Sequence, residues 1–506
     1  MGFIVASGID FLLNAEARDL LNTVSAYFST LINVLLSSFF FFLTRIMKKK
    51  LFNLNHKLTH RMSSNEIVNE KFLEWCEKVG IDFNNNSIVI KETADKNRHL
   101  ITEKFIPNGT ILFKVPYSAM LNPITSEIKS LLKDLKNVAA ESSDSEDEED
   151  GTDLWKELVV SIHKELQKGE ASNWYPYLSI LPTAKGQKFD NLYYWNDAEL
   201  EYLKPAKCVE RIGNDKVQLM FEQIHDLYNV PDLTKEEFLK ISSIIMSYSF
   251  DVNGKSLVPV SDLLNASWNY NSVLEVDDED EDQFICMVAK KDIQEGEELI
   301  NIYGNHPNGE LLRMYGYVED DNENEFAEVD LDTLIELDEK NATIIEKIDD
   351  CYDMEDPLIM QTFDVYKDEG IVSELVVLCE IISNYNDDVK KGLKDNQIIK
   401  KTIEKVIKNH QIGSETKALL KKLIDLTMEK YQTNPLLTKK YQSKQGYSKE
   451  YMASVVLKTE YDCLAKAMDI LDKEYEIIDN KELEKLERKK RRLDKKEDRM
   501  AKRSKR

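Results

Sequence analysis

The chain has few cysteines and histidines, and their spacing gives no recognisable structural metal site. Its six cysteines are scattered along the sequence, and no Cys-x-x-Cys pair occurs. Structural zinc clusters need several ligands at short spacing, so no such cluster has a visible ligand set here. The seven histidines are dispersed as well, and no i, i+4 pair has an acidic partner. We therefore predict no metal in the functional site, and reduced thiols inside a cell.

Positive charge is also in short supply. The chain holds 67 Lys and Arg against 92 Asp and Glu, which gives a formal net charge of −25 at pH 7. The acids are concentrated in residues 141–153 and 275–282. Such runs are ordinarily solvated loops, but an acidic surface also attracts basic proteins and repels nucleic acid. With 506 residues, 42% of them apolar, the chain has room for two or three domains.

Two stretches in the second half of the chain carry short motifs in a fixed order. The first stretch, residues 259–265, reads PVSDLLN. The second, residues 296–319, contains GEE, then NIYG, then ELL and finally YGYVE. Each string is common by itself. The ordered set at this spacing is far more specific than any of its parts.

This ordered set resembles the catalytic half of SET-domain protein methyltransferases, in the branch with a Rubisco-methyltransferase-type C-terminal domain. The resemblance implies an α+β fold: a SET-domain β-fold with a knot-like active site, a helical insert and an all-helical C-terminal domain. We expect an N-terminal extension over residues 1–64 and a SET domain over 65–330, with the insert at about 121–252. A helical substrate-binding domain over 331–480 and a basic tail over 481–506 follow.

The resemblance implies methyl transfer from S-adenosyl-L-methionine to a lysine amine of a protein. The amine must be neutral to attack, and a lysine with a pKa of about 10.4 loses its proton at pH 7 at a cost of about 4–5 kcal/mol. A narrow apolar channel disfavours the ammonium and lowers that cost. By resemblance, Tyr303 is the catalytic tyrosine that orients the amine, and Tyr315 lines the lysine channel. Asp262 is expected to brace its turn beside the substrate.

The same resemblance places the cofactor contacts in two segments, and both depart from the family pattern. Asn265 matches the asparagine that holds the knot and the cofactor, but Ala266 replaces the usual histidine. Asn97, Arg98 and His99 stand where the family has a Gly-x-Gly turn that admits the methionine end of the cofactor. Asparagine tolerates a left-handed turn, whereas histidine cannot copy the clearance of glycine. We assign these five residues, with the catalytic tyrosine, to cofactor binding.

Several other side chains near the motifs receive a role or are denied one. Tyr248 stands where plant relatives carry an arginine near the cofactor, and we assign it to the substrate site. The histidine that replaces the second glycine is not expected to act as a base, because the family uses no histidine base there. Three tryptophans are assigned to packing, since aromatic residues at such spacing ordinarily belong to the core: Trp155, Trp174 and Trp195.

One long apolar run lies near the N-terminus. Residues 20–44 contain no charge and are long enough to span a bilayer, and Arg45 with lysines at 48–50 follows them. The alternative is that translation begins at Met47 or Met62, because the family resemblance begins only near residue 65. We expect the later start, and a membrane contact only if the extension is translated.

The last third of the chain is predicted to be helical. Apolar residues recur at three-four spacing, with charges between them, in residues 371–383, 396–408, 417–430 and 451–471. No catalytic motif occurs there, so this region is interpreted as a docking domain. The tail beyond it is rich in Lys and Arg and indicates nuclear import, a merely solvated helix end or an RNA-contacting arm. We expect a nuclear location, with the cytoplasm as a further possibility.

These observations favour a protein-lysine N-methyltransferase that acts on a basic protein. Within the family, the resemblance points to the ribosomal branch, so we expect monomethylation of a lysine of a large-subunit ribosomal protein. A lysine of a nuclear protein and a histidine of actin are the enzymatic alternatives. A SET scaffold that has lost its cofactor and only binds a partner is the non-enzymatic one, because of the replaced glycines and the replaced histidine. Direct nucleic-acid binding is expected only through the tail.

Overall fold

The computed structural model describes most of the chain between residues 64 and 478. The described ranges are 64–83, 87–92, 98–126, 151–182, 189–252, 254–277, 284–352, 357–441 and 448–478. The apolar run, the basic tail and Asn97 lie outside them. Within these ranges no helix is both long and apolar enough to cross a membrane. The chain divides into two compact units, Met1–Glu70 and Lys71–Arg506, and the description below concerns the second.

A small antiparallel sheet forms the β-part of the N-terminal half. Its strand order is β3 (Ile111–Pro116), β8 (Phe284–Ala289), β7 (Ser272–Asp277), so the central strand pairs on both edges. The sequence of β8, FICMVA, is continuously apolar, as expected for a buried central strand, and all but its first residue are buried. Beside it, β1 (Ile88–Glu92) and β2 (Arg98–Thr102) form a two-stranded antiparallel hairpin.

The hairpin differs from the sequence-based expectation at the replaced Gly-x-Gly turn. Arg98 and His99 belong to strand β2, where they pair with Glu92 and Lys91, and are not part of a turn. The strand sequence RHLIT ends in β-branched and apolar residues, and Leu100 is fully buried. Arg98 and His99, the last two of the three residues that replace the Gly-x-Gly turn, therefore form a paired strand and not a tight turn.

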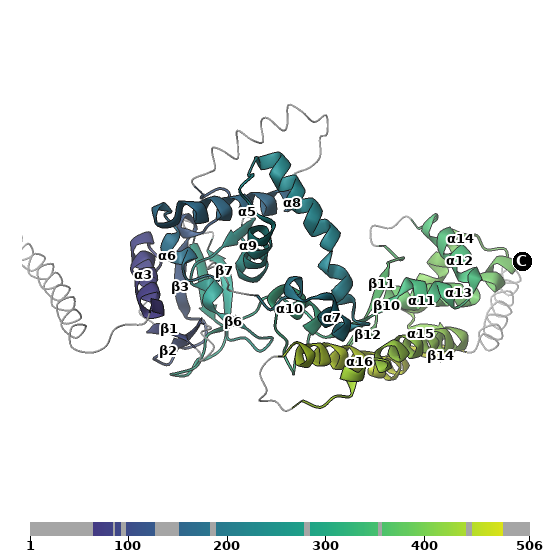
Figure 1. The fold of residues 1–506 in the computed structure, drawn as a ribbon. Coiled ribbons are helices and arrows are strands. Elements are labelled where there is room, and N and C mark those ends of the chain that lie inside the picture. The colour runs from purple at the N-terminus through teal and green to yellow at the C-terminus, as the bar shows by residue number, and fades with distance from the viewer. Residues whose placement is uncertain are drawn as a thin grey trace, which may run out of the picture. The chain divides into compact units, whose positions relative to one another are not determined.

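Most of the helices of the N-terminal half lie in the insert. Among the described residues of 121–252 they are α5 (Gly151–Lys168), α6 (Tyr175–Leu178), α7 (Asp197–Leu200), α8 (Asn214–Tyr228) and α9 (Lys235–Tyr248). Helix α9 begins at Thr234, whose side chain accepts a hydrogen bond from the backbone N–H of Glu237, and its apolar face is buried. Figure 1 shows α5 and α9 packed beside each other.

The three tryptophans predicted to pack do so. Trp174 and Trp195 are buried, and their indole N–H groups donate to the backbone carbonyls of Ala119 and Asp190. The ring of Trp155 meets Phe238 edge-on, with centroids 6.0 Å apart. These rings therefore contribute to the core and not to a binding surface.

The two motif segments meet in a short parallel pairing. Strand β6 (Asn265–Ala266) pairs with β9 (Ile300–Asn301), with Asn265 opposite Ile300. Helix α10 (Asn308–Tyr315) follows β9, and the hairpin of β4 (Ser249–Asp251) and β5 (Lys255–Leu257) precedes the first motif. Parallel neighbours cannot be joined by a tight turn. The intervening residues therefore make a long excursion, and that excursion includes β7 and β8.

The C-terminal region is mainly helical, as predicted. Its helices are α11 (Leu331–Glu336), α12 (Glu339–Asp349), α13 (Ser373–Lys390), α14 (Asp395–Ile403), α15 (Ser414–Gln432) and α16 (Lys449–Glu474). The last four contain the four segments predicted from three-four spacing, apart from two residues before α13 and five after α14. Figure 1 shows α16 lying along α15.

Short strands supplement these helices, so the expected all-helical composition needs a correction. Strand β10 (Phe326–Asp330) pairs with β11 (Thr362–Tyr366), which pairs with β12 (Gly370–Ile371). A parallel pair, β13 (Gln411–Gly413) and β14 (Glu476–Ile478), lies farther along. The β11 sequence, TFDVY, alternates buried and half-buried residues with period two, which is the pattern of a strand and not of a helix.

One hydrophobic cluster joins the C-terminal helices to part of the insert. Its buried members include Leu203, Ala206 and Cys208 together with side chains of α13, α15 and α16. The 3-10 segments η4 (Glu201–Leu203) and η5 (Lys207–Ile212) therefore share a core with elements that follow them by more than a hundred residues. Sequence position had assigned them to the SET insert, and the domain limits drawn there remain a proposal.

Candidate active site

Tyr303 lies just after β9, where the second motif segment passes the first. Its hydroxyl donates a hydrogen bond to the backbone carbonyl of Leu264, at 2.8 Å between the oxygens. Leu264 immediately precedes β6, so the β6–β9 pairing brings donor and acceptor together. The contact confirms that the two motif segments meet at this tyrosine.

Three tyrosine rings form a cluster around this point. The ring centroids of Tyr303 and Tyr315 are 4.7 Å apart, and Tyr317 lies 6.5 Å from the first and 6.3 Å from the second. Gly316 lies between Tyr315 and Tyr317 in the sequence, at the end of α10, and has a φ of +79°. A left-handed glycine at this position ends the helix and lets both neighbouring rings face the same site.

Burial keeps these phenols protonated. It raises the pKa of Tyr303 well above its usual value, an effect that the neighbouring acidic groups reinforce, and it raises the pKa of Tyr315 to about 12. Burial also raises the pKa of Tyr248, the last residue of α9, to about 12. At pH 7 these hydroxyls are therefore neutral hydrogen-bonding groups and not proton acceptors.

Asp262 is buried beside the cluster. The Tyr177 hydroxyl, from α6, donates to its Oδ2 at 2.5 Å, while its Oδ1 has no hydrogen-bond partner among the described residues. Burial raises the pKa of this carboxyl to about 7, although the hydrogen bond from Tyr177 opposes the shift. Asp262 thus ties its segment to the insert, and its expected role in bracing its own turn stays a prediction.

The backbone just before Asp262 is strained. Val260 has a φ of +72°, which a β-branched residue adopts only when its surroundings force it. Such a conformation costs about 1–3 kcal/mol and is found preferentially at functional sites. Val260 is almost completely buried, so packing maintains the strained turn that leads into the motif.

Asn265 and Ala266 hold the first segment against the second. Their backbones form β6, and the Asn265 side chain donates to Glu298 at 2.6 Å. The Asn265 side chain is exposed, and Ala266 is half-buried. This arrangement fits the expected joining role of the asparagine, and the role of both residues in cofactor binding stays a prediction.

Arg98 and His99 approach the same region from β2. The guanidinium of Arg98 donates to the carbonyl of Ile180 at 2.8 Å. Its positive charge lowers the pKa of Tyr248 and so opposes the larger effect of burial. Nδ1 of His99 is buried without a partner among the described residues, as is Oγ of Ser261. Unpaired buried polar atoms normally have a partner in the functioning protein, so they fit a polar ligand such as S-adenosyl-L-methionine.

The structure adds two residues that sequence reasoning had not placed in the site. Tyr177 lies 85 positions before its partner, Asp262, and belongs to the insert, so no local pattern marks it. Tyr317 stands in the YGYVE string next to the recognised tyrosine, and its spacing could have identified it. The long-range contact required the tertiary structure, and the short-range one did not.

Comparison with known proteins agrees with this geometry. The profile of the SET domain family matches residues 97–304. Ribosomal lysine N-methyltransferase 4 of Saccharomyces cerevisiae is 28% identical over 479 residues, which cover 82% of this chain and 94% of that protein. N-lysine methyltransferase SETD6 of Mus musculus is 25% identical over 402 residues, which cover 72% and 81%.

Solved structures show the same fold. The SET domain of LSMT bound to lysine and AdoHcy superposes with a TM-score of 0.57 at 17% identity, covering 81% of this chain and 92% of that one. Rubisco LSMT bound to AdoMet gives a TM-score of 0.54 at 17% identity, covering 80% and 92%. Together with the tyrosine cluster at the paired motif segments, these similarities show a SET domain at residues 97–304 and a resemblance, along most of the chain, to SET-domain protein-lysine N-methyltransferases.

Proposed function

We propose that this SET-domain enzyme monomethylates a lysine of a large-subunit ribosomal protein, with S-adenosyl-L-methionine as methyl donor. The observation that carries the catalytic part is the Tyr303 hydroxyl held on the Leu264 carbonyl within a cluster of neutral tyrosines. The ribosomal part is supported by the similarity to ribosomal lysine N-methyltransferase 4 along nearly the whole length of that protein.

The residues that would hold the cofactor are Arg98 and His99 on β2 and Asn265 and Ala266 on β6. When bound, S-adenosyl-L-methionine supplies an electrophilic methyl group on a sulfonium, which is a good leaving group. Asn97, assigned to the same role, lies outside the described residues. The two strands belong to separate segments, so the site depends on the fold that brings them together.

The tyrosine cluster would prepare the substrate amine. Half-buried aromatic rings exclude water and disfavour an ammonium, which lowers the cost of about 4–5 kcal/mol for deprotonating a lysine at pH 7. The Tyr303 hydroxyl donates its hydrogen bond to the Leu264 carbonyl. The tyrosine oxygen would therefore act toward the substrate as a hydrogen-bond acceptor. Tyr303 is therefore the orienting residue, Tyr315 forms the wall, and Tyr248 and Asp262 lie beside them in the substrate site.

A basic protein is the substrate class that suits the charge of the chain. Its formal net charge of −25 favours the encounter with a cationic protein and opposes binding to nucleic acid. The similarity to N-lysine methyltransferase SETD6 supports the second candidate, a lysine of a nuclear protein.

The basic tail, residues 481–506, supports the nucleus as the location of this protein. A chain lacking the tail should lose nuclear accumulation in fluorescence microscopy.

The first test is calorimetric binding of S-adenosyl-L-methionine to the purified chain starting at Met62. We expect an affinity on the order of micromolar. Radiolabelled transfer to isolated large ribosomal subunits should then label one protein at a lysine. Labelling of only non-ribosomal proteins in an extract would contradict the ribosomal proposal. A folded chain that does not bind the cofactor would instead support the non-catalytic scaffold.

Tyr303→Phe is the matched test of the catalytic role. The variant loses one hydroxyl and its hydrogen bond to Leu264 but keeps the ring in the cluster. We expect methyl transfer to fall by about 10²-fold or more, as when one orienting hydrogen-bond group is removed from an active site. The variant should still bind the cofactor in calorimetry, because the ring and the other assigned cofactor residues remain in place. Full activity of the variant on the natural substrate would refute this mechanism.

A further inference from the structure

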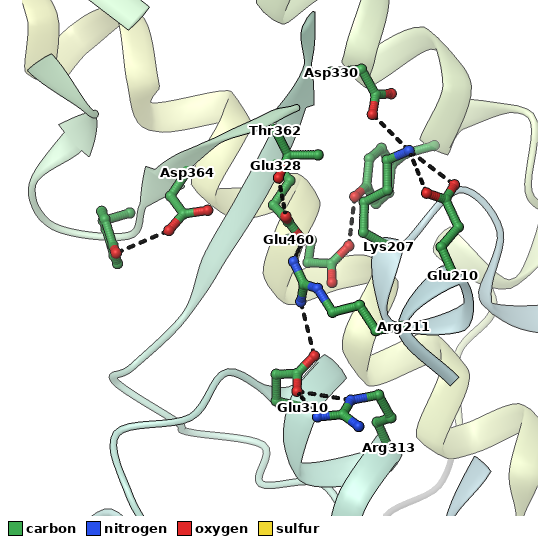
Figure 2. A network of polar contacts seen from close by, with 12 residues as sticks. Lys207, Glu210, Arg211, Glu310, Arg313, Glu328, Asp330, Thr362, Asp364 and Glu460 are labelled. Atoms are coloured by element: carbon green, nitrogen blue, oxygen red, sulfur yellow. Dashed lines mark hydrogen bonds and ion pairs between the residues drawn. The ribbon is translucent and has the colours of Figure 1, made fainter. Parts of the chain in front are cut away.

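A network of charged side chains lies where helix α10 meets the C-terminal sheet. Figure 2 shows Arg211, from η5, between Glu328 of β10 and Glu310 of α10. Its guanidinium is 2.8 Å from Oε1 of Glu310 and forms a second ion pair with Glu328. One side chain therefore joins three elements: the insert, the helix after the catalytic tyrosine, and the C-terminal sheet.

Both carboxylates are held firmly. Glu310 also accepts hydrogen bonds from Nε and Nη2 of Arg313, at 2.9 and 2.6 Å, and Glu328 accepts one from Thr362 at 2.8 Å. The side chains of Glu310 and Glu328 are only 13% and 8% exposed. The two carboxylates are shielded from water while the Arg211 side chain is 36% exposed, so these ion pairs are screened less than pairs that are exposed on both sides.

The position of Glu310 on α10 connects this network to the active site. Glu310 stands in the first turn of the helix, and Tyr315 is its last residue. The two residues are five positions apart, which corresponds to a rise of about 7.5 Å along the helix axis. Because the ring of Tyr315 packs 4.7 Å from that of Tyr303, a change in the tilt of α10 would displace the wall of the lysine channel.

We propose that Arg211 is a positioning residue for methyl transfer: its two ion pairs set the orientation of α10 and thereby the placement of Tyr315 against Tyr303. The proposal rests on the proposed lysine methyltransferase function. The planar fork of arginine presents separate donors to the two carboxylates in a fixed geometry, whereas lysine would contact them with one compact ammonium. A displacement of about 1 Å at a catalytic group can cost about 10²-fold in rate.

The same 3-10 segment contains a matched control. Lys207 lies four residues before Arg211 and pairs with Asp330 at 2.6 Å and Glu210 at 2.9 Å. It therefore connects η5 to the end of β10 but makes no ion pair with α10. Its side chain is 18% exposed, against 36% for Arg211, so its loss also removes a partly buried charge from the same segment. Lys207→Gln removes a junction ion pair and leaves the tether of α10 in place.

The experiment compares Arg211→Gln, Arg211→Lys and Lys207→Gln in the full chain. Turnover is measured as radiolabel transferred from saturating S-adenosyl-L-methionine to large ribosomal subunits. Arg211→Gln should lower kcat about tenfold or more, with little change in KM or in cofactor affinity, and Arg211→Lys should be intermediate. Lys207→Gln should keep the wild-type kcat. Equal kcat values for the two Gln variants would overturn the proposal.

Two further measurements keep the inference testable if a variant or the substrate fails. Hydrogen exchange of the α10 amides should be faster in Arg211→Gln than in Lys207→Gln, and equal exchange would overturn the proposal without any assay of activity. Glu310→Gln should reproduce the loss of kcat, and the double variant with Arg211→Gln should be no worse than either alone. Additive losses would show that the pair does not act as a unit. An inactive wild type would refute the proposed function separately.

Discussion

Individual side chains in this site are tuned by burial more than by charge. Tyr303 and Tyr315 remain protonated because their phenols are removed from water, and the same cause acts on the nearby acid, Asp262. The pKa of Asp262 is about 7, against an ordinary value of 3.8. The carboxyl is surrounded by groups from several elements: Cys76 of α3 (Ser64–Val79), Tyr177 of α6, Tyr248 of α9, and Tyr303.

A pH dependence of stability follows from Asp262. A carboxyl whose pKa is raised in the folded state binds its proton more tightly there than in the unfolded chain. Its contribution therefore favours folding below about pH 4 and is lost progressively as the pH rises to about 7. Asp262→Asn cannot ionise. We expect its melting temperature, relative to that of the wild type, to increase from pH 4 to pH 8.

The Tyr177→Phe variant is the control for this prediction. The hydrogen bond from the Tyr177 hydroxyl lowers the pKa of Asp262, so its removal should raise that pKa further. The loss of stability should then extend to higher pH than in the wild type. A pH-independent difference between Asp262→Asn and the wild type would show that this carboxyl has an ordinary pKa in the folded chain.

Among the elements, the end of α10 is the most tightly constrained near the site. Gly316 turns the chain with a φ of +79°, and a Cβ there would lie 2.6 Å from the backbone N of Asn191 and 2.6 Å from the backbone C of Asp190. Backbone atoms cannot move aside as a flexible side chain can. The glycine thus meets two demands at once, a left-handed conformation and a close approach to the segment before η3 (Leu192–Tyr194).

Gly316→Ala is expected to destabilise the fold more than Gly109→Ala. Gly109 has nearly the same φ, +80°, but an added Cβ would meet nothing within 4 Å. The Gly109 variant measures the conformational strain alone, about 1–2 kcal/mol. Gly316→Ala adds a steric overlap of about 1–3 kcal/mol. Denaturant unfolding of both variants measures the difference, and equal destabilisation would mean that the backbone near Asn191 yields without cost.

At the scale of the whole molecule, the core of the C-terminal region extends into part of the catalytic half. Buried residues between 192 and 212 belong to the same cluster as α13, α15 and α16. The Arg211 network adds polar contacts at the same junction. A division of the chain after residue 330 would separate β10 from its partner strand β11. It would also expose the apolar side chains of η4 and η5.

A fragment covering residues 62–330 should therefore fail to fold on its own, although it contains every catalytic motif. Exposing several fully buried apolar side chains costs about 1.5–3 kcal/mol each, which is a large part of the stability of a domain. Residues 62–480 should be soluble and melt cooperatively. Circular dichroism and size-exclusion chromatography compare the two. A monomeric, cooperatively melting 62–330 fragment would show that the shared cluster is dispensable.

Much of the site could be predicted because its signals are local. The order of the PVSDLLN, NIYG and YGYVE strings identified Tyr303 and Tyr315, and three-four spacing identified the C-terminal helices. Residues whose role depends on a distant partner gave no such signal. Tyr177 meets Asp262 only after the insert folds back, and β2 takes up Arg98 and His99 because β1 offers a pairing edge.

The sequence by itself indicated the resemblance to SET-domain methyltransferases, the reaction that this resemblance implies and the segments expected to carry it, because these depend on residue types at short spacing. The tertiary structure decided which distant groups meet. It places the hydroxyl of Tyr303 on the backbone carbonyl of Leu264 and Arg211 between two carboxylates, and it buries Asp262 with one oxygen unpaired among the described residues. It also decided that residues 192–212 of the insert share one core with the C-terminal helices. Such contacts arise from burial of surfaces that are far apart in the chain, and a linear pattern does not specify which surfaces meet.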